Sequence, residues 1–217
     1  MPYFKNKDVN LLFIHIPKTG GSSLEIYFSK KYSIKLCMTS LFEIYRNIYS
    51  KILPTSPQHL TYNKIYKFKD SFKIDFNDLK IITIVRNPYH RIISDLFFFD
   101  LIKIDSNPNF VYEKIIKFTT NVKTYDNHPL PQYLYLIDKN NNNELLKNLI
   151  ILKTENLNND MYNNGYTDFN LFEQVNKNKN LNYNSYLNNK SIKLINTLYE
   201  KDFEYFNYEM KKNRIKL

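Results

Sequence analysis

Short apolar runs alternate with amphipathic segments along the chain, and this alternation is typical of an α/β fold. Two of the runs, residues 11–16 and 80–85, have the composition of strands buried on both faces of a parallel sheet. Each run is followed by a turn and then by apolar residues at helical spacing, which predicts helices over 22–31 and 89–102. Two strand–turn–helix units in succession predict a parallel sheet.

The rest of the chain adds elements of both kinds. Residues 149–153 form another apolar run that we expect to be a strand, 33–38 a possible short strand, and 133–137 either strand or helix. Apolar residues at helical spacing predict three further helices, at 41–53, 110–118 and 191–206. Because we find neither a repeat nor a domain boundary, we expect residues 1–217 to form a single three-layer α/β domain with a central parallel sheet flanked by helices.

The turn after the first apolar run carries the most informative residues. It reads P-K-T-G-G-S-S-L, and Gly20 and Gly21 are two of only 3 glycines in 217 residues. Glycine tolerates positive φ and lets a ligand approach the main chain closely. Ser22 and Ser23 would open a helix, whose N-terminus favours an anion, and Lys18 adds a positive charge. The turn therefore predicts a phosphate-binding loop; the alternative is an ordinary strand-to-helix turn that holds a lysine.

A second group of polar residues follows the run at 80–85. Arg86 comes at the end of this strand, where open α/β sheets place their ligands, and Pro88 suits the first position of a helix. One face of the helix then carries Asn87, His90 or Arg91, and Ser94. Arg86 and Ser94 can thus converge on one phosphate. The alternative is a capped helix with a few polar residues.

Composition narrows the classes of partner and compartment. The formal charge of +10 favours anionic partners: a nucleotide, nucleic acid, an acidic glycan or an anionic membrane. The lysines are dispersed, so we expect no nucleic-acid partner. The single Cys37 excludes an intrachain disulfide. The apolar run at 11–16 is too short for a signal peptide, and none approaches the ~20 residues of a membrane helix, so we expect a cytoplasmic or otherwise soluble intracellular protein.

Two motifs, taken in order, resemble one family. In the common nucleotide-triphosphate loop the lysine follows the glycines, whereas here it precedes them. The string H-I-P-K-T-G-G-S-S-L instead resembles the cofactor loop of sulfotransferases that use 3′-phosphoadenosine 5′-phosphosulfate (PAPS), closest to the carbohydrate-type group with the heparan sulfate 2-O-sulfotransferases. V-R-N-P-Y-H-R-I-I-S resembles their 3′-phosphate motif, with the same spacing of eight between Arg86 and Ser94. Weaker similarities to the same sulfotransferases continue over most of the chain. Residues 177–189 differ most from the pattern of that family.

The resemblance implies a P-loop-like sulfotransferase fold, PAPS as sulfate donor, 3′-phosphoadenosine 5′-phosphate (PAP) as product, and no metal. It implies an acceptor hydroxyl, on a glycan by analogy with the carbohydrate-type group. Arg86 and Ser94 would hold the 3′-phosphate. The 5′-phosphosulfate would be held by Lys18, Thr19, Gly20, Gly21, Ser22 and Ser23. Golgi relatives are generally membrane-anchored, and the absence of a long apolar run sets this chain apart from them.

Sulfuryl transfer needs positioning, charge stabilisation and a base that takes the acceptor's proton. Lys18 would stabilise the charge on the leaving group. His59 would be the base, because 2-O-sulfotransferase-like members place a base histidine between the two cofactor motifs. We expect His15, inside the first strand, to be a packed core residue. The alternates for the base are Glu43, Glu25 and His128, of which Glu25 is poorly placed if it lies on the outer face of its helix.

Two other functions stay open. A nucleotide-dependent phosphotransferase would share the loop and the sheet, but it needs a magnesium site, and the displaced Lys18 argues against it. A catalytically inactive protein that binds sulfated or phosphorylated glycans would keep the same fold. The complete set of Lys18, Arg86 and Ser94 makes that function less expected. The identity of the acceptor and the oligomeric state are not specified by the sequence.

Overall fold

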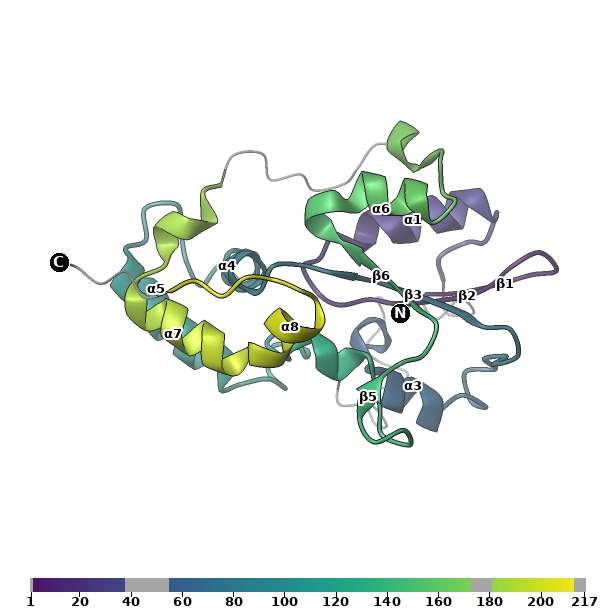
Figure 1. Cartoon of the computed structure of the whole chain (residues 1–217), viewed down its shortest axis with the longest axis horizontal. Helices are drawn as coiled ribbons and strands as arrows, with labels where there is room; N and C mark the ends of the chain where they lie inside the picture. The colour runs from purple at the N-terminus through teal and green to yellow at the C-terminus, as the bar shows by residue number, and fades with distance from the viewer. Residues whose placement is uncertain (1, 38–54, 173–180, 213–217) are drawn as a thin grey trace.

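The computed structural model describes residues 2–37, 55–172 and 181–212. Its centre is a four-stranded sheet in the order β1-β2-β3-β6 (Figure 1). Three neighbouring strands are parallel: β2 (Asn10–Ile14), β3 (Lys80–Val85) and β6 (Leu149–Lys153). The edge strand β1 (Tyr3–Lys5) runs antiparallel to β2. The predicted central parallel sheet is therefore confirmed, with β1 as an addition that the sequence analysis missed.

Helices cover both faces of this sheet, because alternate residues of each strand point to opposite sides. Phe13 and Ile82 pack beneath α1 (Gly21–Lys31) and α6 (Leu157–Asn163). Leu12 and Ile14 face the other side, toward α3 (Tyr62–Lys67). Figure 1 shows α1 and α6 on one side of the sheet, and α3 with the small hairpin β4 (Ile137–Asp138) and β5 (Glu144–Leu145) on the other.

A third group of helices lies beyond the end of β3 (Figure 1). It consists of α4 (Pro88–Phe98), α5 (Pro108–Thr119), α7 (Asn189–Leu198) and α8 (Glu200–Tyr205). Tyr89, Ile93 and Ile115 are among the residues of its own apolar core. Asn87 caps α4 by accepting a hydrogen bond from the N–H of Tyr89 at 3.0 Å, as its position before a proline predicts.

Several short 3₁₀ helices connect these elements and carry residues of the site: η2 (Pro57–His59), η3 (Gln132–Tyr135), η4 (Thr154–Asn156), η5 (Phe169–Leu171) and η6 (Tyr183–Tyr186). The pattern at 133–137, left open between strand and helix, thus resolves into η3 followed by β4. Within the described residues, no helix combines the length and apolar character needed to cross a membrane.

Three predicted elements are wrong in extent or kind. Residues 33–37 form no strand; Ser33 adopts a left-handed φ of 53°, and Ile34 packs against the core beside α1 instead of pairing. The helix predicted to reach residue 102 ends at Phe98. The stripe at 191–206 belongs to two helices that meet at Tyr199, whose hydroxyl donates to the carbonyl of Pro129 at 2.9 Å. The helix predicted at 41–53 lies outside the described residues.

Candidate functional site

The turn between β2 and α1 has the geometry of an anion-binding loop. Lys18 has a left-handed φ of 62°, and Gly20, with a φ of 91°, precedes the first residue of α1. Among the described residues, no side chain caps α1, and the Ser23 N–H donates to the carbonyl of Gly20 at 3.2 Å. The first N–H groups of a helix carry the positive end of its dipole, so this helix start favours a negative group.

Side chains from α4 and from the residues that follow β3 and β6 hold the carbonyls of this loop. Three successive carbonyl oxygens each accept one hydrogen bond: Pro17 from Nε of Arg91 at 3.1 Å, Lys18 from Nη1 of Arg86 at 3.0 Å, and Thr19 from Oγ1 of Thr154 at 2.6 Å. The loop carbonyls are thereby engaged away from the start of α1. This arrangement removes acceptors that would repel an anion and fixes the loop to β3 and β6.

Gly21 is required because an imidazole occupies the space beside it. A Cβ atom at this position would lie 2.8 Å from Nε2 of His15. The His15 ring is held in turn by Glu25, whose Oε1 is 2.5 Å from Nδ1, and by Gln58 at 3.2 Å. His15 is therefore the packed residue that the sequence analysis expects. Glu25 is only 2% exposed and faces inward, so it does not lie on the outer face of its helix.

The side chain of Lys18 lies beside α4. Its Nζ is 4.3 Å from the centre of the Phe98 ring. Burial lowers the pKa of Lys18 below its ordinary value; the charge of Asp95 acts in the opposite direction and that of Arg86 adds to the lowering. A partly desolvated ammonium interacts more strongly with an approaching anion than one in open water does.

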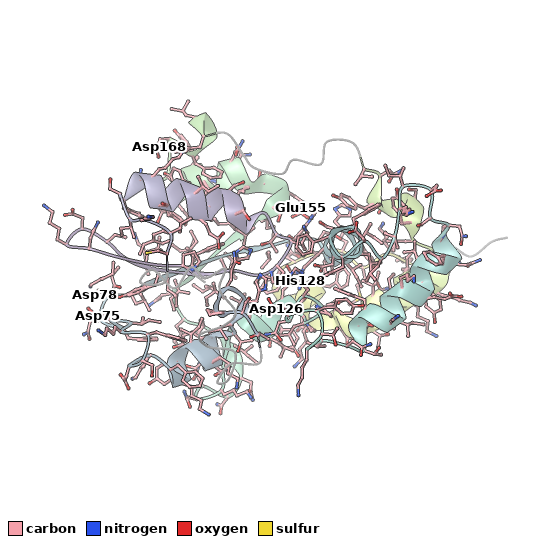
Figure 2. All side chains as sticks on the ribbon, turned by 180° about the vertical axis from the view of Figure 1, so that it is seen from behind. Asp75, Asp78, Asp126, His128, Glu155 and Asp168 are labelled. Carbon is pink, nitrogen blue, oxygen red and sulfur yellow. The ribbon has the colours of Figure 1, made fainter. Side chains whose placement is uncertain are left out.

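The Arg86 turn is held rigidly by side chains that are distant in the sequence. Gln132 accepts from the Arg86 N–H at 2.9 Å and donates to its carbonyl at 2.8 Å. Glu155 accepts from the N–H of Asn87 at 2.8 Å and from the hydroxyl of Tyr208 at 2.9 Å. Figure 2 places Glu155, Asp126 and His128 in the middle of the molecule, whereas Asp75, Asp78 and Asp168 lie nearer its periphery.

The two predicted 3′-phosphate residues lie on the same strand–turn–helix unit. The Arg86 guanidinium lies 5.0 Å from the centre of the Tyr183 ring, and Tyr183 also stacks on His90 at 5.2 Å. Ser94 lies on α4, is 9% exposed, and its hydroxyl makes no hydrogen bond to any residue that the structure describes. No contact joins Arg86 to Ser94, so their convergence on one phosphate stays a prediction. Arg91 instead holds carbonyls, including that of His128.

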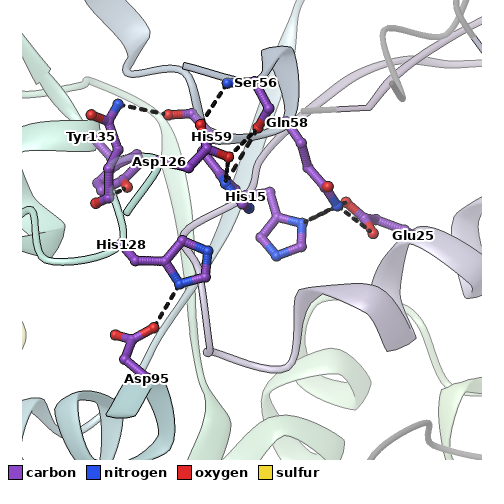
Figure 3. Close-up of polar contacts among 10 residues, drawn as sticks. His15, Glu25, Ser56, Gln58, His59, Asp95, Asp126, His128 and Tyr135 are labelled. Atoms are coloured by element: carbon purple, nitrogen blue, oxygen red, sulfur yellow. Dashed lines mark hydrogen bonds and ion pairs between the residues drawn. The ribbon is translucent and has the colours of Figure 1, made fainter. Parts of the chain in front are cut away.

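Three histidines lie side by side next to the loop, each paired with a carboxylate (Figure 3). The His59 ring centre is 5.5 Å from that of His15 and 4.8 Å from that of His128. The His128 partner is Asp95, at 2.7 Å from Nδ1. His59 pairs with Asp126, at 2.8 Å from Nδ1. Its Nε2 makes no hydrogen bond within the described residues, which leaves that atom available to a substrate.

Burial keeps His59 uncharged. It lowers the pKa of His59 to about 3, and the neighbouring His15 and His128 add to this lowering, while the bond to Asp126 opposes it. Burial alone would raise the pKa of Asp126, but its bonds from His59 and Ser56 lower that pKa to about 2. At neutral pH the pair is therefore a neutral imidazole beside an ionised carboxylate. A neutral imidazole is the form in which a histidine accepts a proton.

The other candidate bases are placed differently. His128 is buried, and its Nδ1 is engaged by Asp95. Glu25 is occupied with His15 and Gln58. Glu43 lies outside the described residues. Sequence reasoning missed Asp126 and Tyr183, because no local motif marks them; each reaches the site through a contact made across many residues of chain.

The arrangement is that of an α/β protein in which a glycine-containing turn and the start of α1 lie beside a neutral histidine. A family model described as the sulfotransferase family matches residues 1–209. The chain therefore belongs to the sulfotransferase family. No curated protein and no solved structure matches the chain.

Proposed function

We propose that this protein transfers a sulfuryl group from PAPS to an acceptor hydroxyl. The observation that carries the proposal is the loop after β2, in which the carbonyls of Pro17, Lys18 and Thr19 are bonded to side chains while the start of α1 is left uncapped. Membership of the sulfotransferase family supports sulfuryl transfer as the reaction. The choice of PAPS as the donor rests on the resemblance of the two motifs to those of PAPS-dependent sulfotransferases, and the charges of these residues fit it.

The loop suits the 5′-phosphosulfate end of the donor. Its anionic oxygens would meet the N–H groups at the start of α1 and the ammonium of Lys18, with main-chain approach eased by Gly20 and Gly21. Thr19 supports the loop from within, because its buried hydroxyl donates to the carbonyl of Ile16 at 2.8 Å. Ser22 and Ser23 complete the first turn of the helix. This set is the one that the sequence motif predicts.

The 3′-phosphate would lie between Arg86 and Ser94. One guanidinium nitrogen of Arg86 is engaged by the carbonyl of Lys18, and the remaining N–H groups can bind a phosphate. The Ser94 hydroxyl is buried and has no partner in the described part of the chain, so a phosphate oxygen would satisfy it. Tyr183 lies against the guanidinium and would restrict its orientation.

The reaction can be written with residues of this chain in each role. Nε2 of His59 takes the proton of the acceptor hydroxyl as its oxygen forms a bond to sulfur. The bond between sulfur and the phosphate oxygen breaks, and PAP leaves with that electron pair. Lys18 stabilises the charge that develops on this oxygen, as cationic groups do in phosphoryl transfer. The acceptor is proposed to be a glycan, and the net charge of +10 favours an acidic one.

Binding of PAP tests the donor assignment without an acceptor. Titration calorimetry in the presence of a metal chelator should show binding, and a hundredfold excess over Kd should stabilise the protein by roughly 2.7 kcal/mol. Lys18→Ala should weaken binding, whereas Lys5→Ala removes the same charge from an ion pair with Asp75 and should not. A melting temperature unchanged by millimolar PAP would overturn the proposal. Tighter binding of ATP with Mg²⁺ would favour the phosphotransferase instead.

A further inference from the structure

We propose that Asp126 is a positioning residue that holds His59 with its proton on Nδ1, so that Nε2 is the atom that accepts the acceptor's proton. This inference rests on the proposed role of His59 as the base. No sequence motif marks Asp126, which lies 67 residues from His59 in the chain. The argument starts from the hydrogen bonds around its carboxylate.

Both oxygens of this carboxylate are engaged by η2 and the residue before it. Oδ2 of Asp126 is 2.8 Å from Nδ1 of His59 and accepts from the hydroxyl of Ser56 at 2.7 Å. Oδ1 accepts from the N–H of Ser56 at 2.6 Å. An ionised carboxylate only accepts hydrogen bonds, so the proton of the neutral imidazole lies on Nδ1. The lone pair of His59 is therefore on Nε2, the nitrogen that has no partner in the described residues.

The backbone around Asp126 is held in an unusual conformation. Asp126 and Asn127 have left-handed φ values of 51° and 67°, and each such residue costs on the order of 1 kcal/mol. The Asn127 side chain donates to the carbonyl of His59 at 3.1 Å, and the Asn127 carbonyl accepts from the hydroxyl of Tyr135 at 2.8 Å. The next residue, His128, packs edge-on against the His59 ring. Three successive residues thus contact His59 and fix its place; Figure 3 shows Asp126 and His128 beside it.

The charges around His59 give Asp126 a second effect. Within the described ranges, the titratable side chains in contact with His59 are His15 and His128 through their rings and Asp126 at Nδ1. The carboxylates of Glu25 and Asp95 are bonded to the two flanking histidines. Of the carboxylates that the structure describes, Asp126 is the one in direct contact with His59. It would stabilise the imidazolium that forms when Nε2 takes a proton.

A purely structural role for Asp126 would be to fix the start of η2 through Ser56, and the variant Asp126→Asn separates this role from positioning. The amide must place its oxygen toward the N–H of Ser56, because the opposite orientation sets two donors against each other. Its NH₂ group then faces Nδ1 of His59. The imidazole must accept that bond, which moves its own proton to Nε2 and leaves no lone pair for the substrate.

The tautomer of His59 can be read by long-range ¹H–¹⁵N NMR on the full chain, with or without PAP and without any acceptor. The wild-type protein should show the proton on Nδ1, and Asp126→Asn should show it on Nε2. Ser56→Ala removes one bond to the same carboxylate, together with the 3.4 Å contact of this hydroxyl with Nδ1 of His59, and should leave the proton on Nδ1. A wild-type proton on Nε2, or an Asp126→Asn variant that folds and keeps it on Nδ1, overturns the proposal.

Transfer of labelled sulfate from PAPS adds the catalytic readout. Asp126→Asn should lower kcat by roughly 10² to 10⁴, with the Kd of PAP unchanged within about twofold. In a His59→Ala background the same change should cost nothing further, because Asp126 acts through His59. If Asp126→Asn lowers kcat in the His59→Ala background by the same factor as in the wild type, Asp126 does not act through His59 and the proposal is contradicted. If the wild-type protein neither binds PAP nor transfers sulfate, the proposed function fails, and the tautomer measurement still decides the role of Asp126.

Discussion

Nζ of Lys18 lies 4.3 Å from the centre of the Phe98 ring, so the lysine of the loop after β2 contacts an aromatic side chain at the last residue of α4. Phe98 is 56% exposed, which is unusual for a phenylalanine beside so many buried neighbours. The same ring stacks on His128 at 5.4 Å and meets the Phe99 ring edge-on at 5.0 Å. One exposed ring therefore connects the loop lysine to the histidine cluster.

Replacing Phe98 with leucine should weaken PAP binding roughly two- to fivefold, because a cation–π contact is worth about 0.5 to 1 kcal/mol at an exposed site and holds Lys18 at the loop. Phe98→Tyr keeps an aromatic face and should bind PAP like the wild type. Titration calorimetry with PAP on the two variants and the wild type measures these affinities. Tighter binding by Phe98→Leu would mean that the ring draws Lys18 away from the ligand, contrary to our account.

Ser94→Ala should weaken PAP much more than adenosine 5′-phosphate, which lacks the 3′-phosphate. The expected loss for PAP is on the order of tenfold, the value of one hydrogen bond to a charged group. Arg86→Ala should likewise weaken the binding of PAP more than that of adenosine 5′-phosphate. It should also weaken adenosine 5′-phosphate to some extent, because Arg86 holds the carbonyl of Lys18. Equal losses of the two ligands in Ser94→Ala would remove Ser94 from the 3′-phosphate site.

The glycines of the loop should respond to alanine in different ways. Gly21→Ala forces a Cβ against the His15 ring and should cost about 1 to 3 kcal/mol of stability together with PAP affinity. Gly20→Ala meets open space but a φ of +91°, and should cost about 1 kcal/mol. Gly165 also has open space around it and a φ of +87°, so Gly165→Ala is the matched control. It should lose a similar amount of stability in urea unfolding and keep its PAP affinity unchanged. Full PAP affinity in Gly21→Ala would contradict the loop assignment.

The His59 pKa of about 3 predicts how stability changes with pH. In the unfolded chain the imidazole takes a proton near pH 6.5, whereas in the folded chain it stays neutral until about pH 3, so the unfolded state binds more protons between these values. Stability should therefore fall as the pH falls below 6.5, by on the order of 1 to 2 kcal/mol between pH 7 and pH 5.

Urea unfolding of the wild type and of His59→Asn at these two pH values checks this expectation. The variant cannot titrate at this position and should lose less stability on acidification. The lowered pKa of Asp126 acts in a separate window, because its contribution is present above pH 3.8 and is lost as the pH falls toward 2. Identical acid sensitivity of the two proteins would show that His59 titrates normally in the folded chain.

Local patterns predicted much of this molecule. The strand at 80–85, the Asn87–Pro88 helix start and the loop glycines are each determined within a few residues, and all three have the expected geometry. Contacts between distant segments account for the failures. Residues 33–37 form no strand: Ile34 packs onto the core, and the described sheet offers them no partner strand.

The sequence predicted only those parts of the candidate site whose residues lie close together in the chain. The loop from Lys18 to Ser23 follows from its motif, but Asp126 meets His59 only because residues 126–128 fold back over η2. The inward placement of Glu25 likewise depends on His15, ten residues earlier and directly after the end of β2. Helical spacing alone does not say which face of α1 a buried histidine will meet.

Transfer of labelled sulfate from PAPS to an array of glycans, small alcohols and tyrosyl peptides tests the central claim most directly. We predict transfer to at least one hydroxyl acceptor, an acidic glycan first, by the wild-type protein. His59→Ala should lose turnover while keeping PAP affinity, and Lys18→Ala should lose both. Tight PAP binding with no transfer to any acceptor, or undiminished transfer by His59→Ala, would contradict the account.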